Sequence, residues 1–245
     1  MRRFGLIGKT LKHSFSASYF AEKFQREGLA GECSYELYEL PEIDDVTRLM
    51  AMPDMVGFNV TIPYKQQIIS HLDGVSAEVE RIGAVNCVKR EADGRWIGYN
   101  TDVVGVRLSL DKLLGDDVVG HALVLGSGGA AQAVRYVLQE RGIDYRVVSR
   151  SRESGDLTYD ELDGDVMATN RLIVNCSPVG MYPNVDNAPA IPYAMLSESH
   201  YLFDLVYNPT LTRFMQLGAE RGASTLSGID MLHAQAEAAW AIWSR

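Results

Sequence analysis

Cysteines are scarce in this sequence, and no long apolar run occurs in it. The three cysteines, Cys33, Cys87 and Cys176, are scattered along 245 residues. Their odd number and wide spacing argue against a disulfide framework and indicate reduced core thiols in a cytoplasmic protein. The first ten residues, "MRRFGLIGKT", contain too short an apolar run for a signal peptide, and no run approaches the length of a membrane span. These absences predict a cytoplasmic protein with no membrane partner.

Metal-ligand patterns and excess positive charge are lacking as well. The five histidines show no ligand spacing, so we expect no metal site. The formal net charge of −9 disfavours nonspecific attraction to nucleic acid or anionic lipid. The remaining composition, 47% hydrophobic and 22% charged residues, is ordinary for a globular protein. A chain of 245 residues is long enough for one large domain or two smaller ones.

Strand and helix patterns alternate through the first half of the chain. Its last two expected strands are joined by "EADG" (91–94), which suits a hairpin turn. Residues 101–114 then predict a connecting helix, with Thr101 or Asp102 as its N-cap. The expected strands are "RFGLIG", "SYELYEL", "GFNVTI", "AVNCVKR" and "RWIGYN", and the expected helices cover 17–27, 41–50 and 63–71.

The second half alternates more regularly. The apolar segments "HALVL", "YRVVSR", "RLIVNCS" and "YLFDLVY" predict buried strands. Between and after them, "AAQAVRYVLQERG" and "GIDMLHAQAEAAWAIWSR" have apolar positions at helical spacing. This alternation predicts an α/β fold with a parallel sheet and helices on both of its faces.

A glycine-rich loop follows the first of these buried strands, in "LVLGSGGAAQAV". Gly126, Gly128 and Gly129 provide a tight turn where bare backbone can approach a pyrophosphate at a helix N-terminus. A glycine triplet alone is weak evidence, but its position between a strand and an alanine-rich helix favours a dinucleotide site. Ser127 and Ala130 complete the predicted cofactor loop.

The end of the next strand indicates which dinucleotide binds. An NAD site usually has a carboxylate there for the ribose hydroxyls, whereas this chain has Ser149, Arg150, Ser151 and Arg152. Arginine and hydroxyl groups suit a 2′-phosphate, which a carboxylate would repel. The alternative is that both arginines are merely solvated in a loop. We predict NADP, bound by Ser149, Arg150 and Ser151.

Polar side chains gather at two places in the first half. "GFNVTIPYK" predicts a strand of residues 59–62 stopped by Pro63, with Lys65 just beyond it. "KHSFSAS" places the hydroxyls of Ser14 and Ser16 before a helix, where they suit a carboxylate, although Ser16 is also a plausible helix cap. "GYNTD" then supplies Asp102. A lysine beside a carboxylate in a cleft is a candidate proton-transfer pair.

In its motifs, the chain resembles the shikimate dehydrogenase family, NADP-dependent enzymes that interconvert shikimate and 3-dehydroshikimate. The matching pieces run in order along almost the whole sequence: "HSFS", "GFNVTIPYK", "GAVNCV", "YNTD", "GSGGAAQAV", "NCSPVGM", "DLVYNPTLT" and "GIDMLHAQA".

The resemblance implies a role for each matched residue. Lys65 and Asp102 fall on the family's catalytic pair. Ser14 and Ser16 would bind the substrate carboxylate, with Tyr207 near it. The ring hydroxyls would be held by Thr61, Asn86 and Gln235, and Met181 belongs to a loop that borders the nicotinamide. Without the family match, Asn86 could satisfy backbone groups, Gln235 could lie on the surface, and Tyr207 could belong to the core.

The resemblance also implies two domains. Residues 1–101 and 228–245 would form a substrate domain with a mixed α/β sheet, and residues 102–227 a Rossmann-like NADP domain. The final helix would return to the substrate domain, with hinges near Asp102 and at Gly228. We expect a monomer or a homodimer that acts on a small molecule and binds no nucleic acid.

Three departures from the family pattern stand out. Ala17 replaces a proline after the second serine, and "SRS" replaces Asn-Arg-Thr around Arg150. Residues 153–170 form a shorter segment than the family has, which predicts a reduced helix and strand. Two other functions stay open: a quinate/shikimate dehydrogenase that uses NAD, and a nonenzymatic NADP-binding sensor. The sensor would be expected to lose Lys65 or Asp102, and both are present.

Overall fold

The protein consists of two compact units. The computed structural model describes residues 1–12 and 14–245, so His13 of the "HSFS" motif lies outside it. Unit 1 comprises Met1–Thr101 with Ala236–Arg245, and unit 2 comprises Asp102–Gln235. The chain therefore passes from one unit to the other after Thr101 and again after Gln235.

Unit 1 contains a mixed six-stranded sheet in the order β2-β1-β3-β5-β6-β4. β1 pairs in parallel with β2 and β3, whereas β5 runs antiparallel to both β3 and β6. Its elements are β1 (Arg2–Gly8), α1 (Ser16–Arg26), β2 (Cys33–Glu39), η1 (Ile43–Asp45), α2 (Val46–Met50), β3 (Met55–Val60), η2 (Gln67–His71), β4 (Gly74–Val75), α3 (Ala77–Ile82), β5 (Cys87–Arg90) and β6 (Trp96–Tyr99), where η marks a 3₁₀-helix. The hairpin at 91–94 and the mixed sheet are confirmed.

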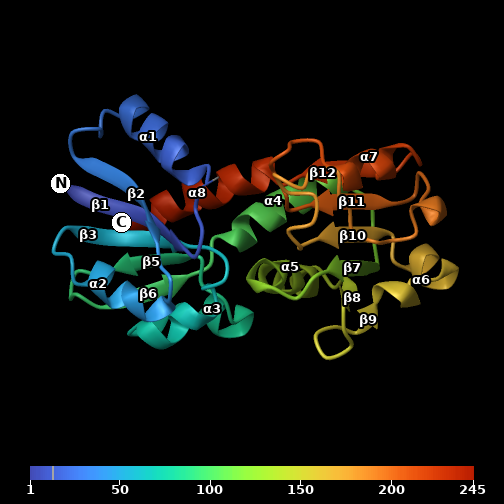
Figure 1. Cartoon of the computed structure of the whole chain (residues 1–245), viewed down its shortest axis with the longest axis horizontal. Coiled ribbons are helices and arrows are strands. Elements are labelled where there is room, and N and C mark those ends of the chain that lie inside the picture. The colour runs from blue at the N-terminus through green and yellow to red at the C-terminus, as the bar shows by residue number, and fades with distance from the viewer. Residues whose placement is uncertain (13) are drawn as a thin grey trace. The chain divides into compact units, whose positions relative to one another are not determined.

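The C-terminal helix α8 (Ile229–Trp243) covers one face of this sheet together with α1 (Figure 1). Aromatic rings drive this packing, since Phe4 lies 5.0 Å from Trp243 and 5.6 Å from Trp240 between ring centroids. The Trp243 indole donates to the Val88 carbonyl at 3.0 Å. A Cβ on Gly57 would lie 2.4 Å from that indole, so only glycine permits this approach.

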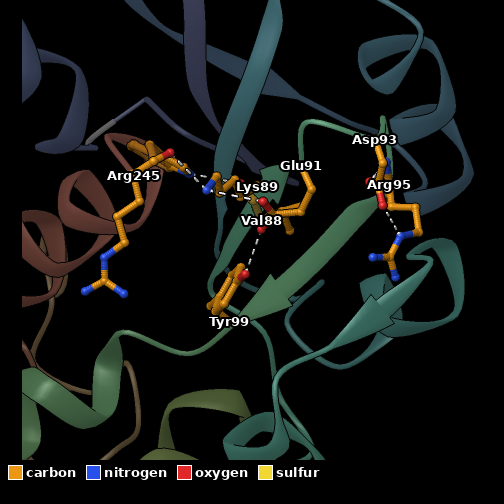
Figure 2. A network of polar contacts seen from close by, with 8 residues as sticks. Val88, Lys89, Glu91, Asp93, Arg95, Tyr99 and Arg245 are labelled. Carbon is orange, nitrogen blue, oxygen red and sulfur yellow. Dashed lines mark hydrogen bonds and ion pairs between the residues drawn. The ribbon is translucent and has the colours of Figure 1, made fainter.

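The last residue is also tied to the β5–β6 hairpin (Figure 2). Lys89 donates to the backbone oxygen of Arg245 at 3.4 Å and pairs with Glu91 at 3.3 Å. Glu91 in turn accepts from the Tyr99 hydroxyl at 2.9 Å. These contacts and the aromatic cluster account for the predicted return of the final helix to the first unit.

Unit 2 contains a wholly parallel six-stranded sheet in the order β12-β11-β10-β7-β8-β9, as the strand–helix alternation predicts. Helices α4 and α5 pack on one face and α6 and α7 on the other, and Figure 1 shows this unit in green to red. Its elements are α4 (Asp102–Leu114), β7 (His121–Leu125), α5 (Gly129–Glu140), β8 (Asp144–Ser149), β9 (Leu157–Thr158), η3 (Tyr159–Glu161), α6 (Gly164–Thr169), β10 (Leu172–Asn175), η4 (Tyr193–Met195), β11 (Tyr201–Asp204), α7 (Arg213–Ala219), β12 (Ser224–Ser227) and the first part of α8.

The strand order of this sheet reverses between β7 and β10. From β7 the chain builds outward through β8 and β9, and it then returns to the other side of β7 with β10. In open parallel sheets, ligands bind at the carboxyl ends of the strands at such a switch point. The glycine loop after β7 and the "NCSPVGM" loop after β10 leave the sheet at this place.

Several predicted boundaries are wrong. The strand β3 ends at Val60, before Thr61, and the helix expected over 63–71 is only the 3₁₀-helix η2. The turn is set by tertiary contacts, because the buried Tyr64 donates its hydroxyl to the Leu40 carbonyl at 2.6 Å. Four short elements, α3, α7, β4 and β12, carry too few residues for a periodic signal and were not predicted.

The reduced segment at 153–170 contains a two-residue strand, β9, and a six-residue helix, α6. The second passage between units falls after Gln235, later than the predicted position 228. The reason is local packing in unit 2: a Cβ on Gly105 would lie 2.6 Å from the Met231 side chain, and Lys112 pairs with Asp230 at 2.6 Å. Gly228, the predicted hinge, accordingly lies inside unit 2.

Candidate active site

One edge of the sheet in unit 1 gathers the predicted substrate residues. β1 and β3 are parallel, so the loop after β1 with Ser14 and the loop after β3 with Thr61 and Lys65 leave the same edge. A Cβ on Gly8 would lie 2.7 Å from the Thr61 methyl group, which shows how closely these loops approach. Because β5 is antiparallel to β3, Asn86 lies at this edge too, and its carbonyl accepts from the backbone N–H of Val60 at 2.9 Å.

Helix α4 begins next to the same edge of the sheet. β6 is antiparallel to β5, and the backbone N–H of Asn86 donates to the Tyr99 carbonyl at 3.1 Å. Thr101 therefore leaves the sheet beside Asn86, and Asp102 follows it directly in the chain as the first residue of α4. The buried Asp102 is 4% exposed, whereas Lys65 is half-buried. Lys65 is anchored through its backbone, whose carbonyl accepts from the N–H of Val85 at 2.7 Å.

A buried network of hydroxyl and amide groups runs along this edge. The Tyr35 hydroxyl donates to Asn59 Oδ1 at 2.9 Å, and Asn59 Nδ2 donates to the Asn86 carbonyl at 3.1 Å. Asn86 Oδ1 accepts from the Thr101 backbone N–H at 2.6 Å, and its Nδ2 donates to the Thr101 hydroxyl at 3.0 Å. Burial raises the pKa of Tyr35 well above its usual value, so this network is neutral. Tyr35 was not predicted, since one tyrosine in a strand carries no sequence signal of such a contact.

The serine pair, Ser14 and Ser16, lies at the start of α1. Ser14 Oγ accepts from the backbone N–H of Ser16 at 3.2 Å. Ser16 is the first residue of α1, and the N-cap position is Phe15, whose side chain makes no capping hydrogen bond, so the alternative that Ser16 is the cap is wrong. The Ser16 side chain partly offsets the effect of burial on the pKa of Tyr35. A helix N-terminus flanked by two hydroxyls is a favourable environment for a carboxylate.

In unit 2, the glycine loop has the geometry that a pyrophosphate needs. Gly126 has φ +104°, in a region that favours glycine, and its N–H donates to the Val148 carbonyl at 2.8 Å. Gly128 is the N-cap residue of α5 and has no side chain that could accept from the first amides of the helix. A Cβ on Gly128 would meet no atom within 4 Å. The loop therefore leaves open space in front of a helix N-terminus, which fits the phosphates of a dinucleotide.

The two arginines after β8 differ in their contacts. Arg152 is tied to its own loop, because it pairs with Glu161 and donates to the Asp156 carbonyl at 2.5 Å. Hydrogen bonds from the Thr158 backbone and from Arg152 lower the pKa of Glu161 to about 2. Arg150 is exposed, and within residues 1–12 and 14–245 its guanidinium forms no ion pair. Of the two arginines, Arg150 is thus the one available to a phosphate, between Ser149 and Ser151.

The remaining predicted residues lie in unit 2. Met181 is 41% exposed in the loop after β10, and Tyr207 is half-buried in the loop after β11. Gln235 is half-buried on α8, where its side-chain amide donates to the Leu232 carbonyl at 3.0 Å. Whether these three side chains touch substrate or cofactor stays a prediction.

Asp204 was missed. It is the last residue of β11, is fully buried, and its pKa is raised to about 6 by burial. Its carboxylate accepts from Asn175 Nδ2 at 2.9 Å and from the Thr212 hydroxyl at 2.6 Å. The sequence offered one signal, an acidic residue at the end of an otherwise apolar strand in "YLFDLVY".

In the described part of the chain, no group of three or more His, Cys, Asp or Glu residues could hold a metal ion. None of the described helices is long and apolar enough for a membrane crossing.

The fold and the glycine loop define a two-domain α/β protein of the dinucleotide-binding class. The family model of the shikimate dehydrogenase substrate binding domain matches residues 6–88, within unit 1. A shikimate dehydrogenase (NADP(+)) from Methanococcus aeolicus is 32% identical over 98% of this chain and 91% of its own length. The chain belongs to the shikimate dehydrogenase family, with an N-terminal substrate domain and a Rossmann-like domain.

Solved structures agree with this assignment over the full chain. Shikimate 5-dehydrogenase from Thermus thermophilus, in complex with NADP(H) and shikimate, superposes with a TM-score of 0.86 at 33% identity and covers 100% of this chain and 94% of that one. A quinate dehydrogenase from Corynebacterium glutamicum in complex with NAD has a TM-score of 0.88 at 25% identity and covers 99% and 93%. The fold is thus common to relatives that differ in substrate and cofactor.

Proposed function

We propose that this protein is an NADP-dependent shikimate dehydrogenase, an oxidoreductase that reversibly reduces 3-dehydroshikimate to shikimate in aromatic amino acid biosynthesis. The observation that carries the proposal is the full-length relationship to NADP-dependent shikimate dehydrogenases together with Lys65 and Asp102 at the edge motifs. Unit 1 then acts as the substrate domain and unit 2 as the NADP domain.

The polar edge of unit 1 supports the assigned substrate contacts. Ser14 and Ser16 bind the carboxylate at the start of α1, with Tyr207 near it. Thr61, Asn86 and Gln235 hold the ring hydroxyls. The hydrogen bonds of the Asn86 side chain with Thr101 fix the position of its amide group at this edge.

Lys65 and Asp102 handle the proton of the reaction. Bound NADP+ supplies the hydride acceptor when shikimate is oxidised. The hydroxyl proton passes to Lys65 at its Nζ atom, and the Asp102 carboxylate holds the ammonium that forms. In the biosynthetic direction, the same Lys65 returns a proton to the alkoxide oxygen. Lysine suits this role because its proton affinity responds readily to its surroundings.

The cofactor residues lie at the switch point of unit 2. The backbone of Gly126, Gly128 and Gly129 faces the pyrophosphate, with Ser127 and Ala130 alongside. Arg150, free of ion pairs to described residues, binds the 2′-phosphate with Ser149 and Ser151. Met181 borders the nicotinamide.

We also infer a cytoplasmic enzyme that is a monomer or a homodimer and binds no nucleic acid. The location follows from the scattered, unpaired cysteines, of which Cys33 and Cys87 are buried. The net charge of −9 supports the absence of a nucleic-acid partner.

The test is the absorbance change at the reduced-nicotinamide band, with shikimate or quinate combined with NADP+ or NAD+. We expect fast turnover only with shikimate and NADP+. Turnover with quinate and NAD+ would instead support the second candidate, which the similarity to the quinate dehydrogenase structure keeps open. A folded protein that binds NADP+ but turns over no combination would support the sensor alternative.

A further inference from the structure

Two loops of unit 2 converge on one buried carboxylate. Asp204 ends β11 and is fully buried, and no basic residue in the described parts of the chain forms an ion pair with it. Its Oδ1 accepts from Asn175 Nδ2 at 2.9 Å and from the Val206 backbone N–H at 3.0 Å. Its Oδ2 accepts from the Thr212 hydroxyl at 2.6 Å. A carboxylate removed from water and without a cation is costly, so its stabilisation depends on these three donors.

The hydrogen bonds of Asn175 connect Asp204 to the loop beside the glycine turn. Asn175 Oδ1 accepts from the backbone N–H of Ser177 at 3.1 Å and from its hydroxyl at 2.7 Å. The Ser177 backbone nitrogen would lie 3.4 Å from a Cβ placed on Gly126, at the lower limit of ordinary contact. Asp204 therefore orients Asn175, and Asn175 holds the loop that leads to Met181 at a set distance from the turn at Gly126.

The other two donors to Asp204, the Val206 N–H and the Thr212 hydroxyl, lie on either side of Tyr207 in the sequence. The Val206 amide precedes this residue, and Thr212 closes the same loop while its hydroxyl caps α7 through the Met215 N–H at 3.4 Å. The two loops are also joined directly, since the backbone N–H of Tyr182 donates to the Asn208 carbonyl at 3.0 Å. The segments with Met181 and Tyr207 are thus parts of one assembly built on Asp204.

We propose that Asp204 is a positioning residue that orients the loops carrying Met181 and Tyr207, and thereby the nicotinamide end of the cofactor site but not its adenosine end. The inference rests on the proposed function, since it assigns the nicotinamide to this edge of unit 2. Burial raises the pKa of Asp204 to about 6, consistent with a carboxyl group retained where its environment disfavours its charge.

Two ligands separate the two ends of the site. NADP+ spans both ends, whereas adenosine 2′,5′-bisphosphate carries the 2′-phosphate and lacks the nicotinamide. We expect Asp204→Ala to weaken NADP+ binding about tenfold, because it leaves buried donors unpaired and the loops misplaced. The same variant should bind the bisphosphate within about twofold of the unchanged protein, since that ligand contacts a distant region. With shikimate, kcat should fall by about a hundredfold through misplaced reactants.

Two further variants test whether the effect of Asp204→Ala comes from a general disruption of unit 2. Asp204→Asn keeps the shape and an acceptor oxygen, so it should restore most of the NADP+ affinity. Asp163→Ala is the matched control, because it removes a carboxylate that accepts from the Val166 N–H at 2.9 Å to cap α6 in the same unit. Binding of both ligands should be unaffected by Asp163→Ala.

If Asp204→Ala does not fold, Thr212→Val removes one donor to the carboxylate together with the side-chain cap of α7, and Thr212→Ser, which keeps the hydroxyl, supplies the rescue. Equal weakening of NADP+ and the bisphosphate, or no change in either, would overturn the proposal. The binding measurements need no turnover, so an inactive protein that still binds NADP+ would refute the shikimate reaction without affecting this test.

Discussion

Two buried polar networks, one in each unit, are built from different chemistry. In unit 1, Tyr35, Asn59, Asn86 and Thr101 form a network of hydroxyl and amide groups. In unit 2, the comparable network has the carboxyl group of Asp204 at its centre, with a pKa raised to about 6. Neutral groups keep their hydrogen bonds at any ordinary pH, whereas a buried carboxylate makes the stability of its surroundings depend on pH. The contribution of the unit 1 network to stability should therefore be insensitive to pH, whereas the contribution of the Asp204 network should depend on it.

The largest expected effect concerns the chemistry at the edge of unit 1. Lys65→Ala should lower kcat by about a thousandfold, within the range for loss of a general acid–base group, while shikimate still binds. Steady-state kinetics and equilibrium binding of shikimate would measure the two quantities. Lys112→Ala, an exposed lysine paired with Asp230 in unit 2, is the control and should keep normal turnover. Near-normal kcat in Lys65→Ala would remove the assigned role.

The pH dependence of unit 2 comes next in size. The pKa of Asp204 is raised from 3.8 to about 6, so its favourable contribution is complete below about pH 4 and is lost as the pH rises through 6. A shift of about two units corresponds to about 3 kcal/mol. The charge of Asp204 also acts on two neighbours, Cys176 and Tyr193, and burial keeps both neutral by raising their pKa.

Urea unfolding of the unchanged protein and of Asp204→Asn, at pH 4 and at pH 7.5, measures this effect. The difference between the two proteins in the free energy of unfolding should change by about 2.5 kcal/mol between these pH values, in favour of Asp204→Asn at the higher pH. A constant difference across this range would mean that Asp204 does not titrate in the folded protein as its burial requires.

A smaller effect is expected at the adenosine end of the cofactor site. Arg150→Ala should weaken NADP+ binding by about 10- to 100-fold, the value of a charge-assisted contact, and leave NAD+ nearly unchanged. Arg152→Ala is a matched control in the same loop, since Arg152 is committed to Glu161. Titration of NADP+ and of NAD+ into each variant measures the dissociation constants that test this prediction. Equal losses for NADP+ and NAD+ in Arg150→Ala would exclude the 2′-phosphate contact.

The smallest effect sharpens the contrast with Asp204. Tyr35→Phe keeps the ring stacked on Phe20 at 4.4 Å and removes only the donor to Asn59. We expect a loss of about 1–2 kcal/mol in the free energy of unfolding. The loss should be the same at pH 5 and pH 8, because no group of this network titrates between them. Tyr38→Phe, on the same strand but with its hydroxyl on Glu36, is the control. A loss that varied with pH would contradict the neutral character assigned to this network.

Much of the fold could be predicted from the residues. Long periodic segments such as α4, α5 and α8 were predicted as helices, and the strand–helix alternation predicted the parallel sheet of unit 2. Short elements were not, because a six-residue helix such as α3 has a cap at Ser76 and a glycine end at Gly83 but hardly two turns of pattern. The end of β3 was misplaced because the buried hydroxyl of Tyr64 decides the turn there.

By itself the sequence determined the local chemistry: a glycine turn before a helix, an arginine after the next strand, and Lys65 and Asp102 in matching motifs. The glycine turn and the arginine depend on neighbouring residues, which periodicity and residue type report directly, whereas the pairing of Lys65 with Asp102 came from the resemblance to the family. Only the tertiary structure decided which distant groups share an edge, that Arg152 is committed to Glu161 while Arg150 is not, and that two loops depend on Asp204. These outcomes depend on strand order and burial, which bring together residues far apart in the chain and change the energy of their charges.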